Sequence, residues 1–187
     1  MQLLVGLWCY GLSTALLVRA GLGVLPWDVL HQGIARRVDH SLGAITVVVS
    51  VLVLLAWIPL RQRPGLGTVA NVAVIGVSVD VSLALLPQVD VLLEQVPLLV
   101  LGIVLNAVAT AAYLGVDLGP GPRDGLMTGL VRRTGGSVRR VRTGIEVAVV
   151  VVGFALGGTV GIGTVAYAVF IGPLVHTLLP RLAVGPR

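Results

Sequence analysis

The sequence predicts an all-α fold, a polytopic transmembrane helical bundle of about six spans built as two repeats of three spans. Hydrophobic residues make up 56% of the 187 positions, charged residues make up 11%, and the mean hydropathy is +1.02, far from the balance of a water-soluble domain. Several charge-free runs approach the roughly 20 residues that a helix needs to cross about 30 Å of hydrocarbon. Long stretches of the first half also recur in the second half.

The expected spans follow one another with short connections. They lie at about 2–20, 41–60, 65–87, 96–116, 138–157 and 161–182. The last charge-free run, Val147–Pro180, has 34 residues, enough for a helix of about 50 Å, which is too long for one span. We therefore expect a break in the glycine-rich segment at 157–163.

Two blocks of sequence recur at a constant offset of 96 residues. Residues 22–37, LGVLPWDVLHQGIARR, agree with residues 118–133, LGPGPRDGLMTGLVRR, at 8 of 16 positions. Residues 65–76, GLGTVANVAVIG, agree with residues 161–172, GIGTVAYAVFIG, at 7 of 12 positions. Such agreement favours a duplication, with a first membrane repeat at 1–95 and a second at 96–187.

Each half contains a Pro-x-Asp segment that is too short to cross a membrane. Pro26–Arg37 has 12 residues, about 18 Å as a helix. Proline in the first turn, with an aspartate two residues later, is a typical helix start. Two interpretations stay open. The short helices either lie in the membrane interface, with the arginines as headgroup anchors, or enter the protein as half-helices whose aspartates face a central aqueous cavity.

The candidate functional residues come from these segments and from the later spans. Candidates for a solute or ion pathway are Asp28, Asp124, Gln32, Thr128, Asp80 and His176. Residues of the structural motif are Gly23, Pro26, Gly33, Gly119, Pro122 and Gly129, and the expected headgroup or topology anchors are Arg36, Arg37, Arg132 and Arg133. Asp80 and His176 occupy equivalent positions and could relay a proton if both are buried. Glu146 is expected near the start of its span, paired with nearby arginines.

The arginines predict the orientation of the chain. All 13 basic residues are arginine, the formal net charge is +5, and the arginines lie between apolar segments, which indicates contact with the lipid bilayer rather than with nucleic acid. With the N-terminus inside, ten arginines are cytoplasmic and three are outside, which favours two cytoplasmic termini. Three spans per half then give inverted repeats. If the Pro-x-Asp segments cross the membrane, the repeats are parallel instead.

No motif for catalysis or metal binding is present in the sequence. Cys9 is the single cysteine, so it forms no intrachain disulfide and has no cysteine partner for a metal site. No serine has the G-x-S-x-G setting, and the three histidines form no ligand cluster with cysteine or paired glutamate. We expect no enzyme activity, no metal and no cofactor.

The G-x-P-W-D-V-L sequence at Gly23–Leu30, its partner G-P-G-P-R-D-G-L at Gly119–Leu126 and the two GxGTVA blocks resemble the YczE/YyaS/YitT family of bacterial integral membrane proteins. The resemblance covers almost the whole chain. It implies a multi-pass protein of the bacterial plasma membrane, and it implies no particular substrate or catalytic residue.

Two classes of function remain open at this point. One is a small-solute or ion permease with its site between the two halves, where transporters built from repeats bind their solutes. The other is a non-transporting membrane accessory or scaffold protein for a neighbouring pathway. A second copy of the chain is a further candidate partner in either case.

Overall fold

The computed structural model describes residues 1–184, which form eight helices and no strand. The helices are α1 (Gln2–Ala20), α2 (Pro26–Val38), α3 (Leu42–Leu60), α4 (Leu66–Leu85), α5 (Leu92–Leu114), α6 (Pro122–Thr134), α7 (Val138–Ala155) and α8 (Ile162–Leu182). The expected short helices after Pro26 and Pro122 are confirmed, as is the break at 157–163, which separates α7 from α8.

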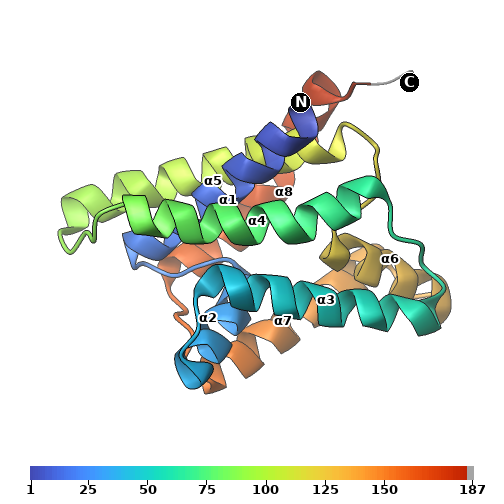
Figure 1. Ribbon diagram of the computed structural model, residues 1–187, viewed down its shortest axis with the longest axis horizontal. Helices are drawn as coiled ribbons and strands as arrows, with labels where there is room; N and C mark the ends of the chain where they lie inside the picture. The colour runs from blue at the N-terminus through green and yellow to red at the C-terminus, as the bar shows by residue number, and fades with distance from the viewer. Residues whose placement is uncertain (185–187) are drawn as a thin grey trace.

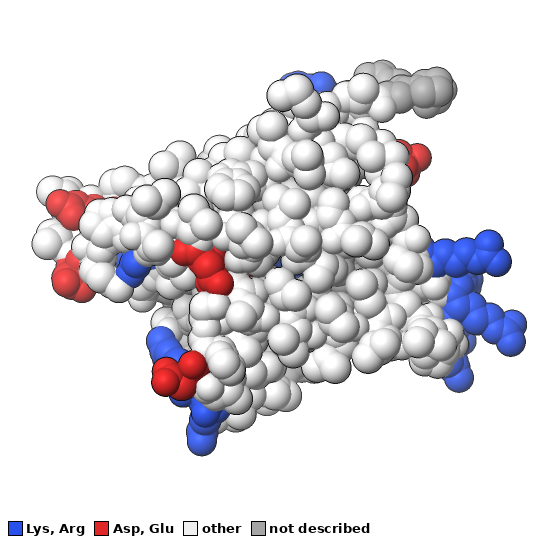
Figure 2. Space-filling model, in the orientation of Figure 1, with Lys and Arg blue, Asp and Glu red and all other residues white. Residues whose placement is uncertain are grey.

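Five of these helices, namely α1, α3, α4, α5 and α8, are long and apolar enough to cross a membrane. The sequence predicts a sixth span at 138–157, but α7 carries Arg139, Arg140, Arg142 and Glu146 in its first half and is not among the five. Large apolar side chains are exposed on the outside of the bundle, such as Leu52, Val100 and Phe170. Figure 2 shows a broad uncharged band between two charged ends. The described chain therefore has the surface of a protein embedded in a bilayer.

The helices form two layers, α1, α4, α5 and α8 in one and α2, α3, α6 and α7 in the other (Figure 1). Helices α1 and α5 pack together at the centre of the first layer and run antiparallel. Gly6 near the start of α1 lies against Tyr113 near the end of α5, whereas Leu17 lies against Gly102. Gln2 also donates a hydrogen bond of 2.6 Å to the carbonyl of Leu182, so the first turn of α1 and the last turn of α8 lie together.

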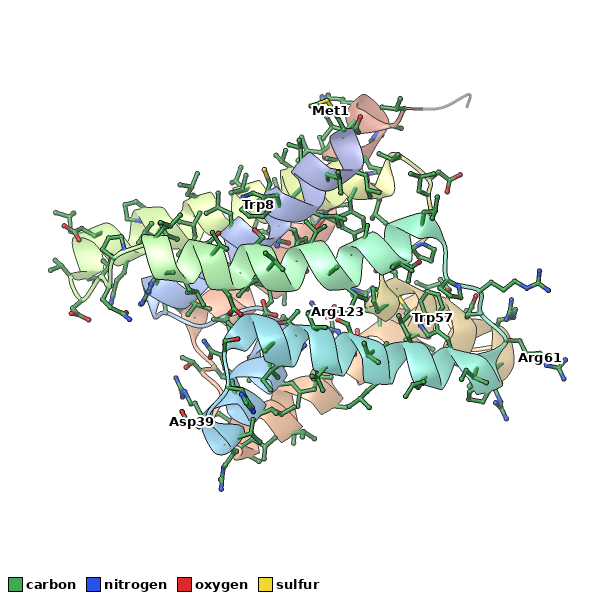
Figure 3. All side chains as sticks on the ribbon, in the orientation of Figure 1. Met1, Trp8, Asp39, Trp57, Arg61 and Arg123 are labelled. Atoms are coloured by element: carbon green, nitrogen blue, oxygen red, sulfur yellow. The ribbon has the colours of Figure 1, made fainter. Side chains whose placement is uncertain are left out.

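Helices α2 and α6 begin near the centre of the bundle and end at its opposite ends. Figure 3 shows Asp39, just after α2, at one end and Arg61, beside the last turn of α6, at the other, while Arg123 in the first turn of α6 lies between the layers. We call these ends the Asp39 end and the Arg61 end. The N-terminal turns of α2 and α6 meet through Asp28 and Arg123, whose closest charged atoms are 3.5 Å apart.

The two recurring sequence blocks pack against each other across the halves. The carbonyl of Leu22 accepts a hydrogen bond from the amide of Gly163, and the carbonyl of Leu118 accepts one from the amide of Gly67, both at 2.8 Å. The segments before α2 and α6 thus cross the first turns of α8 and α4. In each case, the block before a short helix in one half of the chain contacts the block that begins a long helix in the other half.

Glycine is required where these segments cross. Gly119 has a φ of 111°, outside the regions that residues with a side chain favour. A Cβ placed on it would lie 3.0 Å from the Cα of Gly65. Gly23 has a φ of 113° and an equally close neighbour in Gly161.

We expect Gly119→Ala to lower the free energy of unfolding by about 2 kcal/mol, because the alanine is strained in this backbone conformation. Unfolding by SDS in mixed micelles measures the effect. Gly144→Ala is the control, since a Cβ at Gly144 in α7 meets nothing within 4 Å and alanine favours a helix. Equal stability of the two variants would contradict the prediction.

Candidate functional site

A cavity of about 370 Å³ lies between the two layers and is lined by both halves of the chain. Its size falls in the range of about 300–1,000 Å³ that is usual for small-molecule sites. Many lining residues come in pairs that are 96 residues apart: Trp27 and Arg123, Thr46 and Arg142, Ser50 and Glu146, Asn71 and Tyr167, and Ile75 and Ile171. The cavity therefore lies where the two halves of the chain face each other.

Arg123 occupies the centre of this arrangement (Figure 3). Its guanidinium lies 3.5 Å from the carboxylate of Asp28, donates a hydrogen bond of 3.4 Å to the hydroxyl of Tyr10, and stacks 5.2 Å from the ring centre of Trp27. A cation over an indole face gains further stabilisation when water is excluded. The charge count along the sequence assigns Arg123 to a cytoplasmic connection, but the structure places it inside the bundle.

Asp28 is buried behind Arg123, with 2% of its surface exposed, and is not among the residues that line the cavity. Its Oδ1 atom lies 3.0 Å from Nδ1 of His31, which in turn lies 3.1 Å from the hydroxyl of Thr46. Within residues 1–184, Oδ2 of Asp28 and Nε2 of His31 are buried without a hydrogen-bond partner. A buried carboxylate is tolerated here because a guanidinium and an imidazole lie beside it.

Asp124 has different surroundings from Asp28, although the two occupy equivalent positions. Asp124 lines the cavity and accepts a hydrogen bond of 3.0 Å from the hydroxyl of Tyr113. None of the ion pairs in the described chain includes Asp124. The N-terminus of α6 favours its negative charge. Asp124 is thus a carboxylate that faces the cavity with the neutral partners Tyr113 and Gly121, while the guanidiniums of Arg123 and Arg142 act on its charge without forming an ion pair with it.

The other predicted pathway residues are spread over the bundle. Gln32 accepts a hydrogen bond of 3.1 Å from the amide of Thr159, and Thr128 donates one of 3.2 Å to the carbonyl of Gly125. Asp80 accepts hydrogen bonds at the start of α3, near the Asp39 end. His176 lines the cavity in the last two turns of α8, which ends at the opposite end, so the structure does not bring Asp80 and His176 together.

The glycine and proline spacing shared by the two short helices has a packing role as well. Pro26 and Pro122 occupy the first turns of α2 and α6, and a Cβ on Gly33 or Gly129 would lie 2.5 Å from Gly153 of α7 or 3.1 Å from Leu60 of α3. The four predicted anchors donate hydrogen bonds to carbonyls at the ends of neighbouring helices. Arg36 and Arg37 bond to Gly157 and Leu156 after α7, and Arg132 and Arg133 bond to Leu60 and Pro59 in the last turn of α3.

The sequence analysis did not select several residues of the site as candidates. They are Trp27, His31, Tyr113 and Arg123. Only the offset of 96 residues, which pairs Trp27 with Arg123, could have marked these two positions. The expected pairing of Glu146 is confirmed, because Glu146 lies 2.9 Å from Arg142, and both residues also line the cavity. No group of three or more potential metal ligands occurs in residues 1–184.

The fold and this cavity define an all-helical integral membrane protein with a polar, partly charged chamber between its two layers. The chain matches the family described as "Family of unknown function (DUF6198)" over residues 1–180, and it belongs to that family.

Three bacterial relatives align with nearly the whole chain. An uncharacterized protein of Haemophilus influenzae is 40% identical over 185 residues, which is 99% of this chain and 85% of the relative. The membrane protein YczE of Bacillus subtilis is 29% identical over 92% of this chain and 80% of its own length. YyaS of the same organism is 27% identical over 94% of this chain and 90% of its own length. The resemblance to YczE and YyaS is therefore confirmed, whereas no solved structure matches the chain.

Proposed function

We propose that the protein is a small-solute or ion permease of the plasma membrane and that the cavity is its binding site. The single observation that carries this proposal is the carboxylate of Asp124, which takes part in none of the described ion pairs, in a cavity lined by equivalent positions of both halves. A charged group at such depth is costly to maintain and usually serves function. The proposal assigns no catalytic residue and needs no cofactor.

The proposal includes two inverted repeats, 1–95 and 96–187, with six spans in total. The order of helices supports this assignment, because α2 and α6 have 13 residues each and begin 96 residues apart. The antiparallel packing of α1 against α5 supports inversion, since equivalent helices of inverted repeats run in opposite directions. In this arrangement α7 is the sixth span, and its arginines lie near the membrane surface.

We further propose that α2 and α6 are membrane-inserted half-helices. Their first turns meet at Asp28 and Arg123, and their last turns lie at opposite ends of the bundle. In transporters with broken helices, such positive helix ends point at the solute or at coupled ions. An interfacial position for both helices fits this meeting of their N-termini less well.

The arginine distribution favours a cytoplasmic Arg61 end, and with it two cytoplasmic termini. Described arginines near the Arg61 end are Arg61, Arg63, Arg132, Arg133, Arg139, Arg140 and Arg181, and those near the Asp39 end are Arg19, Arg36 and Arg37. Figure 2 shows the basic cluster at the Arg61 end.

Reporter fusions test the inverted topology. His40 follows α2 and Gly136 follows α6, so the two positions are equivalent. We expect a reporter at Gly136 to indicate the cytoplasm and a reporter at His40 to indicate the outside. Two cytoplasmic reporters would favour parallel repeats instead.

Transport by purified protein in vesicles tests the proposed function. Labelled ethylamine, alanine, acetate and rubidium would be supplied to proteoliposomes, with protein-free vesicles as the blank. We expect faster uptake of at least one cationic or zwitterionic probe, because Arg123 and Arg142 of the cavity are paired with Asp28 and Glu146, whereas Asp124 forms no ion pair. Uptake no faster than the blank for every probe would favour the accessory or scaffold function.

A further inference from the structure

The two halves differ at the seam between their third and fourth helices, α3 with α4 in the first half and α7 with α8 in the second. In the first half, α3 and α4 are in close contact. The carboxylate of Asp80 accepts a hydrogen bond of 2.6 Å from the hydroxyl of Ser41 and one of 2.7 Å from the amide of Gly43. A Cβ on Gly43 would lie 2.1 Å from the carbonyl oxygen of Gly76, so the two backbones touch. This seam is closed.

The equivalent seam between α7 and α8 is open. These helices are not among the pairs of elements that pack together in the described chain. Gly172 is equivalent to Gly76, yet a Cβ on it would meet nothing within 4 Å. Gly153 is the one buried residue of α7, whereas α3 has eight buried residues. In the second half, the residue equivalent to Asp80 is His176, and its side chain is exposed.

The cavity reaches this open seam. Its lining includes Ile145 and Glu146 of α7 together with Gly172 and Val175 of α8. These residues belong to the half of α7 and the half of α8 nearer the Arg61 end. The opening therefore faces sideways, towards the region that lipids occupy around a membrane-embedded bundle.

The chemistry of the lining changes from the seam inward. Ile145, Val175 and Leu179 supply apolar surface near the seam, beside the ion pair of Arg142 with Glu146, whereas Asp124 supplies a carboxylate from the first turn of α6. Tyr10, Tyr113 and Tyr167 add aromatic rings to the inner wall. Arg123 and Arg142 also line the cavity, but each has a carboxylate partner in Asp28 or Glu146, so Asp124 is the carboxylate left for a protonated amine. The apolar residues of the seam suit a hydrocarbon chain.

We infer that the cavity takes an amphipathic amine, a protonated amine on an apolar chain, which enters from the bilayer through the seam between α7 and α8. The amine binds Asp124 and the chain lies along the apolar seam. This inference rests on the proposed function in treating the cavity as the binding site, and it adds the class of solute and the route of entry. The first half's closed seam explains why entry is confined to one side.

Binding of matched probes to the full chain in lipid nanodiscs tests the inference. The probes are labelled octylamine, ethylamine and octanoate, and empty nanodiscs of the same lipid correct for partitioning. We expect octylamine to bind at least about tenfold more tightly than ethylamine, and octanoate to show no saturable binding. Equal affinity for the two amines, or tighter binding of octanoate, would overturn the inference.

A bulky residue in the seam tests the route. Gly172 and Gly144 both leave space for a side chain, but Gly172 lines the cavity and Gly144 does not. We expect Gly172→Phe to weaken octylamine binding by about tenfold, and Gly144→Phe to leave it unchanged, with equal thermal stability for both variants. Unchanged octylamine binding to Gly172→Phe would overturn entry through the seam.

These results separate the inference from the proposed function. Uptake of small hydrophilic probes without binding of octylamine would overturn the inference and leave the permease assignment standing. Binding of octylamine that depends on Gly172, without uptake of octylamine or of any smaller probe by proteoliposomes, would support the binding site and contradict the permease assignment.

Discussion

Asp28→Asn is expected to lower the free energy of unfolding by about 3 kcal/mol, because it leaves the Arg123 guanidinium without a counter-charge. Asp28 is 2% exposed and contacts both Arg123 and His31. Asparagine keeps the shape of the side chain but removes its charge. Because 23% of the Arg123 side chain is exposed, the loss falls at the lower end of the usual range for a broken buried pair. Titration with SDS measures it.

A double variant provides the control for this prediction. Arg123→Gln removes the charge that Asp28→Asn leaves unpaired, so the two substitutions together should cost less than the sum of their separate effects. Additive losses would show that the pair does not stabilise the meeting of α2 with α6. A loss for Asp28→Asn as small as that for an exposed aspartate, such as Asp90, would contradict the prediction itself.

Asp124→Asn is expected to abolish solute uptake and to leave the fold intact. The carboxylate lines the cavity, and its hydrogen-bond partner is the neutral hydroxyl of Tyr113. Arg123 and Arg142, which also act on this carboxylate, keep Asp28 and Glu146 as their partners, so its removal leaves no charge unpaired. The loss of a favourable charge at the start of α6 should cost about 1 kcal/mol or less. Uptake of the probe that the wild type transports, measured in proteoliposomes, tests the expectation.

Asp90→Asn is the matched control for transport. Asp90 lies in the exposed connection between α4 and α5, far along the chain from the cavity-lining residues. The Asp90→Asn variant should take up the probe as fast as the wild type does. If Asp124→Asn also transported like the wild type, Asp124 would be only a charge at a helix start, and the accessory or scaffold function would become the better account.

The sequence predicts the beginnings of the short helices well because these depend on local chemistry. Proline at Pro26 and Pro122 sets the backbone for a first helical turn, and the aspartate two residues later meets the positive end of the helix. It predicts α7 less well. The apolar second half of α7 is typical of a membrane span. Its first half carries four charged residues, so α7 is not among the five helices that are long and apolar enough to cross a membrane.

The candidate site could be predicted only in part. Of the two interpretations left open by the sequence, one placed both aspartates in a shared cavity and the other made them charges at helix starts. Asp124 lines the cavity, whereas Asp28 lies behind Arg123 and contacts His31. The two aspartates share a local sequence pattern, so no local rule could distinguish them. The residue before Asp28 is Trp27, whereas the residue before Asp124 is Arg123. The Arg123 side chain extends to the carboxylate of Asp28, and this contact makes the surroundings of the two aspartates different.

The sequence by itself determined that this is an apolar, all-helical membrane protein, with sequence blocks that recur 96 residues apart and a short proline-initiated helix in each half of the chain. The hydropathy of a segment and the positions of proline and glycine are properties of a continuous stretch of sequence, so they predict spans and helix boundaries without knowledge of the neighbouring helices. Only the tertiary structure decided that one seam is closed by Gly43 and Asp80 and the other open at Gly172, and that one aspartate is buried while the other faces the cavity. These features depend on contacts between residues far apart in the chain, and segments that agree at about half of their positions acquire different neighbours when the two halves pack together.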